Sequence, residues 1–314
     1  MNHLENKIIL PGGAGLVGQN LIVHLKINGY KNITVIDKHK KNLNIIKKLH
    51  KDVKVIEADL SLKGSWQEEF IDAESVIMLQ AQIGGLYYKE FVSNNIHSTE
   101  NILNTMLKHN NPYLVHVSSS VIESVANDFY TESKKAQELL VKKSKIDHVI
   151  LRPTLMFGWF DRKHLGWLSH FMKLVPIFPI PGHGNYIRQP LYAGDFSKII
   201  MSCIKNRITD KTYNISGLER INYIDMIRII KKSIRSKVLI IKIPYKIFYF
   251  LLWLWSVFDK NPPFTTQQLE ALVAKDEFEV INWPKIFSIS STPFSDAINE
   301  TFNHKDYSSI RLDF

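Results

Sequence analysis

A tyrosine and a lysine four positions apart form the chain's clearest candidate for proton-transfer chemistry. Tyr130 and Lys134 would lie on one face of a helix, because residues four apart are neighbours on a helical surface. A nearby ammonium group favours the phenolate, so we expect Lys134 to lower the pKa of Tyr130 from about 10 toward neutrality. Such a tyrosine could take or give the proton of a substrate hydroxyl. The pair alone is a weak signal, because two common residue types meet at this spacing by chance.

A run of three serines strengthens the case. Ser118, Ser119 and Ser120 follow the apolar stretch 113–117, which predicts a strand. In folds with parallel sheets, ligands bind beside the carboxyl ends of the strands, so one of these hydroxyls could polarise a substrate oxygen. Anchoring by the strand favours Ser119 over Ser120 as the catalytic serine. The alternative is that the serines only form a turn.

A glycine-rich loop near the start of the chain predicts a dinucleotide site. The pattern Gly13-x-Gly15-x-x-Gly18 follows the predicted strand 7–10 and opens the predicted helix 16–27. In this context the glycines allow a tight turn and a close approach of a pyrophosphate, which the helix N-terminus attracts. The residues expected to line the cofactor here are Gly12, Gly15, Leu16, Val17 and Gly18. With a nicotinamide bound, Tyr130 would move a proton while a hydride is transferred, and Lys134 could also bind the nicotinamide ribose.

An aspartate at the end of the second predicted strand indicates which dinucleotide is preferred. Asp37 lies nineteen residues past Gly18, where a carboxylate would accept hydrogen bonds from the adenosine ribose hydroxyls and repel a 2′-phosphate. NAD is therefore expected. Lys38, His39 and Lys40 leave NADP open, because cations at this position could accommodate the phosphate.

Strands alternate with helical segments over the first half of the chain. Six strands are predicted, at 7–10, 33–36, 53–56, 75–79, 113–117 and 149–151, with a helix at 94–109. This alternation predicts an α/β fold with a Rossmann-type, doubly wound parallel sheet. The pattern loosens after Pro153, so we expect residues 1–165 to form the dinucleotide-binding domain. Residues 166–314 would then form a smaller, interleaved substrate-binding lobe.

Composition narrows the function classes. The lysines behind the formal charge of +10 are scattered in pairs, which indicates solvated helix faces and not a nucleic-acid site. A basic surface would still attract an anionic substrate or an anionic lipid surface. The twelve histidines show no metal-ligand spacing, so no metal site is expected. Cys203 is the single cysteine, so an internal disulfide is excluded, and we expect this residue in the core. The absence of disulfides and of an apparent signal peptide favours a cytoplasmic protein.

One aromatic segment stands apart from the dinucleotide pattern. Residues 247–255 are nine uninterrupted apolar or aromatic residues, with lysines and prolines on both sides. The segment is too short to span a bilayer, which needs roughly 20 such residues. It would be either a buried helix or dimer surface, or a patch that dips into the lipid interface at the inner face of a membrane.

Taken together, these pieces resemble the extended or atypical short-chain dehydrogenase/reductases, the NAD-dependent epimerase/dehydratase family, over nearly the full length. The further matching segments are Ala58-Asp59-Leu60, Leu79-Gln80-Ala81-Gln82, Asn95 with 98–101, 151–158 and 182–195. The resemblance implies cofactor contacts by Asp59, Leu60, Ala81, Asn95 and Pro153. It also implies that segment 182–195 holds the nucleotide of a nucleotide-sugar substrate, with His183 and Arg188 near a phosphate, and that the protein is a homodimer. An ordinary solvent-facing loop is the alternative for His183 and Arg188.

Departures from the family pattern narrow the expected reaction. Pro11 stands where relatives usually have threonine, which could alter the glycine loop but leaves all three glycines. Tyr130 follows Ser119 by only eleven positions, fewer than in many sugar-nucleotide epimerases, so the substrate pocket should be more open. Ser120 and Val121 replace the Asp-Glu pair that the family's 4,6-dehydratases use, which disfavours dehydration. We therefore expect an epimerase or a keto-sugar reductase that acts on a nucleotide sugar or a lipid-linked sugar. Ser119, Tyr130 and Lys134 would carry out its chemistry, and Ser119 and Tyr130 would also contact the substrate.

Two other readings stay open. The aromatic segment and the short Ser-to-Tyr loop resemble a membrane-associated, non-catalytic dinucleotide-binding subunit such as the accessory subunit of respiratory complex I. The intact serine, tyrosine and lysine argue against it, because a scaffold needs none of them. A hydroxysteroid-like dehydrogenase with an apolar pocket would use the same three residues.

Overall fold

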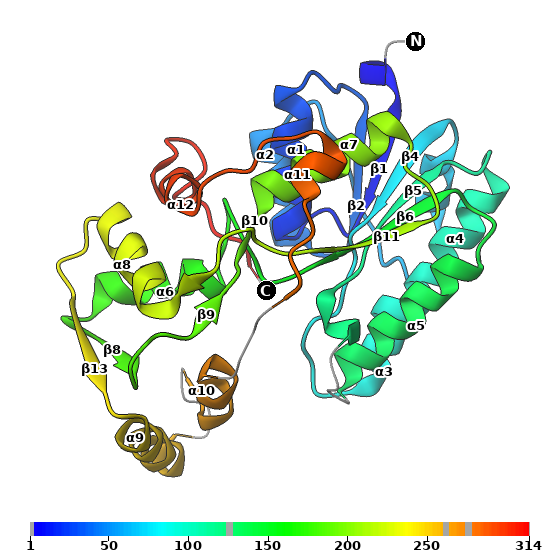
Figure 1. Ribbon diagram of the computed structural model, residues 1–314. Helices are drawn as coiled ribbons and strands as arrows, with labels where there is room; N and C mark the ends of the chain where they lie inside the picture. The colour runs from blue at the N-terminus through cyan, green and yellow to red at the C-terminus, as the bar shows by residue number, and fades with distance from the viewer. Residues whose placement is uncertain (1–2, 124–127, 260–263, 274–277, 314) are drawn as a thin grey trace.

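A parallel sheet of seven strands organises the larger part of the molecule (Figure 1). The computed structural model describes residues 3–123, 128–259, 264–273 and 278–313. The strands of the main sheet are β1 (Lys7–Pro11), β2 (Ile33–Asp37), β3 (Lys54–Glu57), β4 (Ala73–Met78), β5 (Tyr113–Val117), β6 (His148–Pro153) and β11 (Lys211–Ile215). Their order is β11-β6-β5-β4-β1-β2-β3, and every pairing is parallel. The predicted Rossmann-type α/β fold is confirmed.

Helices cover both faces of this sheet. One face carries α1 (Leu16–Ile27), α2 (Lys40–Leu49), α7 (Ala193–Asn206) and α11 (Trp283–Phe287). The other face carries α3 (Tyr88–Phe91), α4 (Ser98–Lys108) and α5 (Phe129–Lys143). Buried strand residues alternate between the two cores: Ile8 and Leu10 point to the first, and Ile9 points to the second. Because the strands are buried on both sides, they read in the sequence as short continuous apolar runs.

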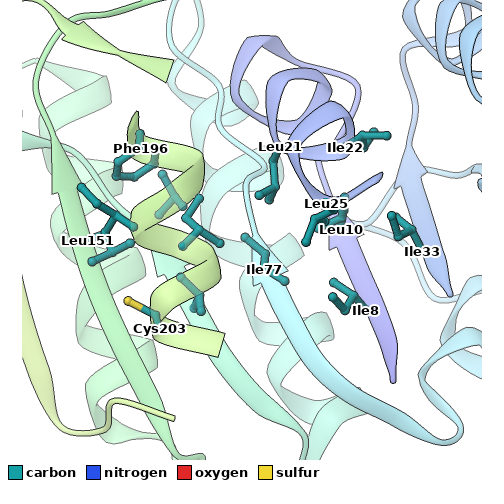
Figure 2. Close-up of a cluster of buried hydrophobic side chains, with 14 of the residues drawn as sticks. Ile8, Leu10, Leu21, Ile22, Leu25, Ile33, Ile77, Leu151, Phe196 and Cys203 are labelled. Carbon is teal, nitrogen blue, oxygen red and sulfur yellow. The ribbon is translucent and has the colours of Figure 1, made fainter. Parts of the chain in front are cut away.

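The first core lies under α1 and α7 (Figure 2). Leu21 and Leu25 of α1 and Phe196 of α7 pack against strand residues such as Leu10 and Leu151. Cys203 is fully buried in the same cluster, as expected, and burial raises the pKa of its thiol to about 12. It is therefore a packing residue.

One of the two edge strands of the sheet, β11, comes from late in the chain. β11 pairs with β6 in parallel, and α7 before it packs on α1, so residues 193–215 lie in the Rossmann-type part. They fall within the range 166–314 that was expected for the smaller lobe. The short strand Lys211–Ile215 was missed because it is half-exposed and carries little apolar pattern.

In the described residues, the smaller lobe is built from short sheets and helices. Its strands are β8 (Ile177–Pro181), paired in parallel with β13 (Leu239–Ile243), and β9 (Ile187–Arg188), paired antiparallel with β12 (Ile221–Asn222). Its helices are α6 (His164–Leu174), α8 (Tyr223–Ser233), α9 (Tyr245–Phe258), α10 (Thr266–Val273) and α12 (Phe294–Asn303). A parallel pair, β7 (Met156–Phe157) with β10 (Leu191–Tyr192), lies where the chain passes between the two parts.

The helix predicted for residues 94–109 begins earlier and is irregular. A π-helical turn, Val92–His97, stands between α3 and α4. Such turns are rare and often occur at functional sites. The turn carries Asn95 and faces α5, the helix on which Tyr130 and Lys134 lie.

Candidate active site

Packing alone requires glycine at several positions of the loop, most strictly at Gly12 and Gly18. Gly12 has φ +75°, and a Cβ built there would lie 2.3 Å from the backbone nitrogen of Gln80. A Cβ on Gly18 would lie 2.3 Å from the carbonyl oxygen of Gly13. A left-handed backbone and these close approaches admit only glycine, so both positions are needed for β1, β4 and α1 to pack.

Gly15 has a different environment. It precedes α1 with an ordinary backbone conformation (φ −79°), and a Cβ built there would meet only the carbonyl oxygen of Gly12, at 3.9 Å. No packing contact therefore requires a glycine at this position. Leu16 and Val17 follow it, half-exposed, in the first turn of α1, whose free N–H groups attract an anion. The missing Cβ keeps open the space in which a pyrophosphate would lie, so the loop fits a dinucleotide.

Asp37 lies beside this loop at the end of β2. Its carboxylate accepts a hydrogen bond from the backbone nitrogen of Ala14 at 3.0 Å and another from that of His39 at 2.9 Å. These bonds fix the carboxylate next to the glycine loop. The side chain of Lys38 turns elsewhere: its ammonium donates to Oδ1 of Asn94 at 2.6 Å and lies 3.4 Å from Asp59.

Asp59, expected near the adenine, is half-buried after β3, and Leu60 beside it is buried. Burial favours the neutral acid, but hydrogen bonds from Ser61 and the charge of Lys38 outweigh it and lower the pKa of Asp59. Ala81 is exposed in the loop after β4, and Pro153 ends β6, two strands away across the sheet. These residues lie at or just beyond the carboxyl ends of β3, β4 and β6, along one edge of the sheet.

Tyr130 lies in the first turn of α5, where the hydroxyl of Ser119 is close enough to favour the phenolate. The helix begins there because the carboxylate of Asp128 accepts a hydrogen bond from the backbone nitrogen of Thr131 at 2.8 Å. Ser120 only begins a turn of 3₁₀ helix, Ser120–Glu123. The contact with Tyr130 thus falls on Ser119, the serine that strand anchoring favoured.

The expected lowering of the tyrosine pKa is not found. Burial raises the pKa of Tyr130, and this effect outweighs the opposing hydrogen bond from Ser119. Lys134 does not act on the phenol as expected, because its side chain turns inward from the same helix. Its Nζ donates to the carbonyl oxygen of Val117 at 3.1 Å and to Oε1 of Gln137 at 2.6 Å.

Lys134 is itself the more perturbed group. Its side chain is almost fully buried, and burial lowers the pKa of the ammonium to about 7, although the charge of Glu138 opposes this shift. A lysine with this pKa exchanges its proton near neutral pH.

A buried polar network continues from Lys134 across to the π-helical turn. The amide of Gln137 donates to Oγ1 of Thr99 at 2.9 Å, and that hydroxyl donates to the carbonyl oxygen of Asn95 at 2.7 Å. The amide nitrogen of Asn95 lies 2.8 Å from Oγ of Ser133 and 3.2 Å from the carbonyl oxygen of Gln82. Asn95 is fully buried, so it positions α5 and the loop after β4 and does not project toward a ligand.

Sequence reasoning missed Ser133, Gln137 and Glu138. All three are buried on the same side of α5 as Lys134. Glu138 accepts two hydrogen bonds from Arg152 of β6, at 2.8 and 2.9 Å, and this contact fixes α5 to the sheet. A signal was present: polar residues at helical spacing from Tyr130 occupy the face on which apolar residues would be expected.

The two predicted phosphate contacts lie in the smaller lobe. His183 is exposed in the turn Gly182–Gly184 after β8, and its Nδ1 accepts a hydrogen bond from the backbone nitrogen of Asn185. Arg188 of β9 is half-buried and donates to the carbonyl oxygens of Ile187 and of Leu272 in α10. The structure thus ties Arg188 to the helix α10, which the sequence did not predict.

Two expected absences concern only the described residues. Within them, no three histidine, cysteine, aspartate or glutamate side chains are grouped as metal ligands would be. Over the same residues, no helix has both the length and the apolar character needed to cross a bilayer.

The family assignment follows from residues 8–216, which match the model of the NAD dependent epimerase/dehydratase family. This match covers the glycine loop, Asp37, the serines, Tyr130 and Lys134. The chain belongs to this family. The resemblance to the extended short-chain dehydrogenase/reductases is thereby confirmed.

Individual relatives are distant. The chain is 23% identical to the low-salt glycan biosynthesis protein Agl12 of Haloferax volcanii over 249 residues, which cover 68% of this chain and 78% of the relative. Among solved structures it resembles a UDP-N-acetylglucosamine 4-epimerase from Methanobrevibacter ruminantium (TM-score 0.71, 18% identity, 95% of this chain and 97% of the other). It also resembles a UDP-glucuronic acid 4-epimerase from Bacillus cereus in complex with NAD (TM-score 0.68, 20% identity, 94% of each chain). At these identities the solved structures support the fold alone.

Proposed function

We propose that the protein is an NAD-dependent epimerase or keto-sugar reductase acting on a nucleotide sugar. The observation that carries this proposal is the proximity of Tyr130, in the first turn of α5, to Ser119, which follows β5 at the carboxyl edge of the sheet where β1 also presents the glycine loop. A phenol and a hydroxyl in contact at this edge can together bind one substrate oxygen and move its proton. The family is NAD-dependent, which agrees with a hydride transfer at the carbon that bears this oxygen.

NAD would lie along the carboxyl edge of the sheet. The residues proposed to hold it are Gly12, Gly15, Leu16, Val17, Gly18, Asp37, Asp59, Leu60, Ala81, Tyr130, Lys134 and Pro153. When bound, the nicotinamide supplies a hydride acceptor or donor. Asp37 would accept hydrogen bonds from the adenosine ribose hydroxyls. Lys38 is bonded to Asn94 and Asp59, so its positive charge would be directed away from a 2′-phosphate.

The chain's own residues would divide the proton chemistry. Ser119 donates to the substrate oxygen and orients it, and Tyr130 takes or returns the hydroxyl proton. Burial keeps Tyr130 protonated in the absence of ligands, so it is ready to act as a general acid. Lys134, with a pKa of about 7, can exchange a proton at neutral pH and turn toward a ribose hydroxyl.

The substrate class rests on the smaller lobe and on relatives. Two solved relatives are named as epimerases of UDP sugars, and Agl12 is named as a glycan biosynthesis protein. We propose that the segment of His183 and Arg188 receives the substrate's diphosphate. If it does, α10 would lie close to the nucleotide, because Arg188 donates a hydrogen bond to the carbonyl oxygen of Leu272. The family resemblance further suggests a homodimer through α4 and α5, and Leu107 and Leu139 on these helices are exposed apolar residues.

The decisive experiment is a panel of nucleotide sugars, incubated with the protein and NAD and followed by NMR. An epimerase would convert the sugar without a lasting absorbance change at the nicotinamide band, whereas a reductase would consume reduced cofactor in proportion to substrate. Tyr130→Phe should abolish turnover, and Tyr87→Phe, at an exposed tyrosine, should leave it unchanged. Turnover that survives Tyr130→Phe would refute the assigned chemistry.

The exposed helix α9 favours a second candidate, a membrane-associated dinucleotide-binding subunit without activity. The same panel separates the two. If the protein retains NAD but turns over neither nucleotide sugars nor lipid-linked sugars, the non-catalytic function is favoured.

A further inference from the structure

Helix α9 packs against the rest of the chain along one narrow stripe. Tyr245, Phe248, Tyr249 and Leu252 are its half-buried apolar residues, and their spacing places them on one face. The ring of Phe248 meets that of Phe264, just before α10, with centroids 6.5 Å apart. None of the residues of α9 is buried. The interpretation of this segment as a buried helix is therefore wrong.

The opposite face of α9 is apolar and exposed. Phe250 is 55% exposed, Val257 61% and Phe258 83%, and the other exposed apolar residues of the helix are Ile247, Leu251, Trp253, Leu254 and Trp255. Trp253 and Trp255 lie on opposite flanks of this face, since successive residues of a helix turn by about 100°. Contiguous exposed apolar surface of this kind marks a contact with lipid or with another protein.

A cationic groove lies beside β13, the strand that leads into α9. It lies between α8 and β13, and its charged lining residues are Arg228, Lys231, Lys232, Arg235 and Lys242. Arg228 forms an ion pair with Asp225 at 2.9 Å. In the part of the chain that the structure describes, no carboxylate pairs with the other four cations. The groove thus presents uncompensated positive charge.

The groove and the apolar face are continuous along the chain. β13 contributes Lys242 to the groove and ends at Ile243, and α9 begins after Pro244 with the exposed Lys246 in its first turn. The elements that carry them, α8, β13 and α9, lie in the smaller lobe on the side of the molecule away from α4 and α5 (Figure 1).

We propose that α9 and this groove bind the surface of an anionic lipid bilayer. The helix of 14 residues is about 21 Å long, shorter than the hydrocarbon core of about 30 Å, so it would lie in the plane of the interface. Its apolar face would enter the acyl boundary, with the two tryptophans at the level of the headgroups. The lysines and arginines of the groove would meet lipid phosphates.

The charge of the groove argues for lipid over a second copy of this chain. A twofold contact places the same patch of both subunits together, so it would bring two cationic grooves against each other. An anionic surface gains from the same charges.

Docking would also position the substrate loop. β13 pairs with β8 along its whole length, up to Ile243 beside Pro181. The turn that follows Pro181 carries His183, and Tyr245 of α9 approaches Gly182 in that turn. The proposed diphosphate site would therefore lie close to the membrane surface.

The test is flotation of the full chain with vesicles of phosphatidylcholine alone and of phosphatidylcholine mixed with phosphatidylglycerol. We expect binding to the anionic vesicles, reduced by high salt because ions screen the headgroup charge. Phe250→Ser with Leu254→Ser should reduce the partition coefficient at least about tenfold, since both side chains would leave the acyl boundary. Ile27→Ser with Leu62→Ser, at exposed positions of the Rossmann-type part, should leave it unchanged.

Two triple charge-reversal variants, one in the groove and one as its control, test the contribution of the groove. Lys231→Glu, Lys232→Glu and Arg235→Glu together should lower binding to anionic vesicles at least about tenfold. The control is Lys47→Glu, Lys48→Glu and Lys51→Glu, which changes the net charge equally at exposed lysines of and after α2. Equal losses in the two triple variants would show a non-specific charge effect and overturn the proposal for the groove.

Fluorescence locates the helix. Trp253 and Trp255 should shift to shorter emission wavelengths with anionic vesicles and be quenched by brominated acyl chains, and Trp253→Phe with Trp255→Phe should remove this response. Absence of binding to both vesicle types, or a dimer in solution that Phe250→Ser and Leu254→Ser dissociate, would overturn the proposal. Sugar turnover of the lipid-free protein is measured separately, so failure here would not count against the enzymatic function.

Discussion

The Nζ of Lys134 donates a hydrogen bond to Oε1 of Gln137, 2.6 Å away and three positions along the same helix. This contact accounts for the inward orientation of a lysine that the sequence placed beside a tyrosine. The amide of Gln137 is held in turn by Thr99 of α4, so the lysine is fixed by a neighbouring helix. Its ammonium is buried and its hydrogen-bond partners are uncharged, so its pKa falls to about 7 in spite of the opposing charge of Glu138.

Lys134 should make folding stability depend on pH. Between about pH 7 and its ordinary pKa of 10.5, the unfolded chain holds a proton on Lys134 that the folded chain lacks. The free energy of unfolding should therefore rise by about 2 kcal/mol between pH 7 and pH 9 from this group alone. Lys134→Met, which keeps the length of the side chain, should remove this rise. Urea unfolding of the cofactor-free proteins at both pH values measures it, and equal pH dependence in the two proteins would contradict the assignment.

The two candidate serines should differ in their effect on turnover. Ser119→Ala removes the hydroxyl beside Tyr130 and should lower kcat about 10²-fold or more, because a donor to the reacting oxygen is lost. Ser120→Ala should have an effect several times smaller, because Ser120 begins the 3₁₀ turn. Steady-state kinetics of both variants decides, and a larger loss in Ser120→Ala would transfer the catalytic function to that residue.

Two glycine substitutions in one loop should fail in different ways. Gly15→Ala should leave the melting temperature nearly unchanged, because a Cβ there meets only one atom, and should weaken NAD binding at least tenfold, about 1.4 kcal/mol. Gly12→Ala should lower stability by more than about 1 kcal/mol, because it combines φ +75° with a collision at Gln80. Calorimetric titration with NAD and thermal unfolding measure the two effects. Normal NAD affinity in Gly15→Ala would contradict the proposal that the pyrophosphate of NAD lies in the space beside Gly15.

Asp37 should set the choice of cofactor. Asp37→Ser removes the charge that would repel a 2′-phosphate, and we expect the ratio of NAD to NADP affinity to fall at least about tenfold. Lys38→Ala should change the ratio little, because Lys38 is held by Asn94 and Asp59. A large loss of NADP affinity in Lys38→Ala would show that this lysine turns to the phosphate when the cofactor binds.

The parts of the fold that could be predicted are those with strong local patterns. The strand before the glycine loop and the strand before the serines are buried on both faces, so each is a continuous apolar run. β11 is half-exposed, and it joins the sheet only through its pairing with β6, more than fifty residues earlier in the chain. Local pattern carries no information about such a pairing.

The site shows the same division. The positions of Ser119, Tyr130 and Lys134 followed from spacing and from the strand end. The direction of the lysine side chain did not, because it depends on Thr99 and Gln137, which meet only when α4 and α5 pack. The pKa of Tyr130 was misjudged for the same reason, since burial is a property of the packed helices.

The return of residues 193–215 to the main sheet bears on how such proteins can diversify. A fragment that ends at residue 165 would lack both β11 and α7, and the apolar side chains of Leu10 and Leu151 would be uncovered. The dinucleotide-binding part is therefore not a module that a single gene fusion could supply. Because α7, β11 and α11 all return to the main sheet, a new substrate lobe would have to be exchanged by several separate replacements within the chain, or be reshaped in place by point substitutions.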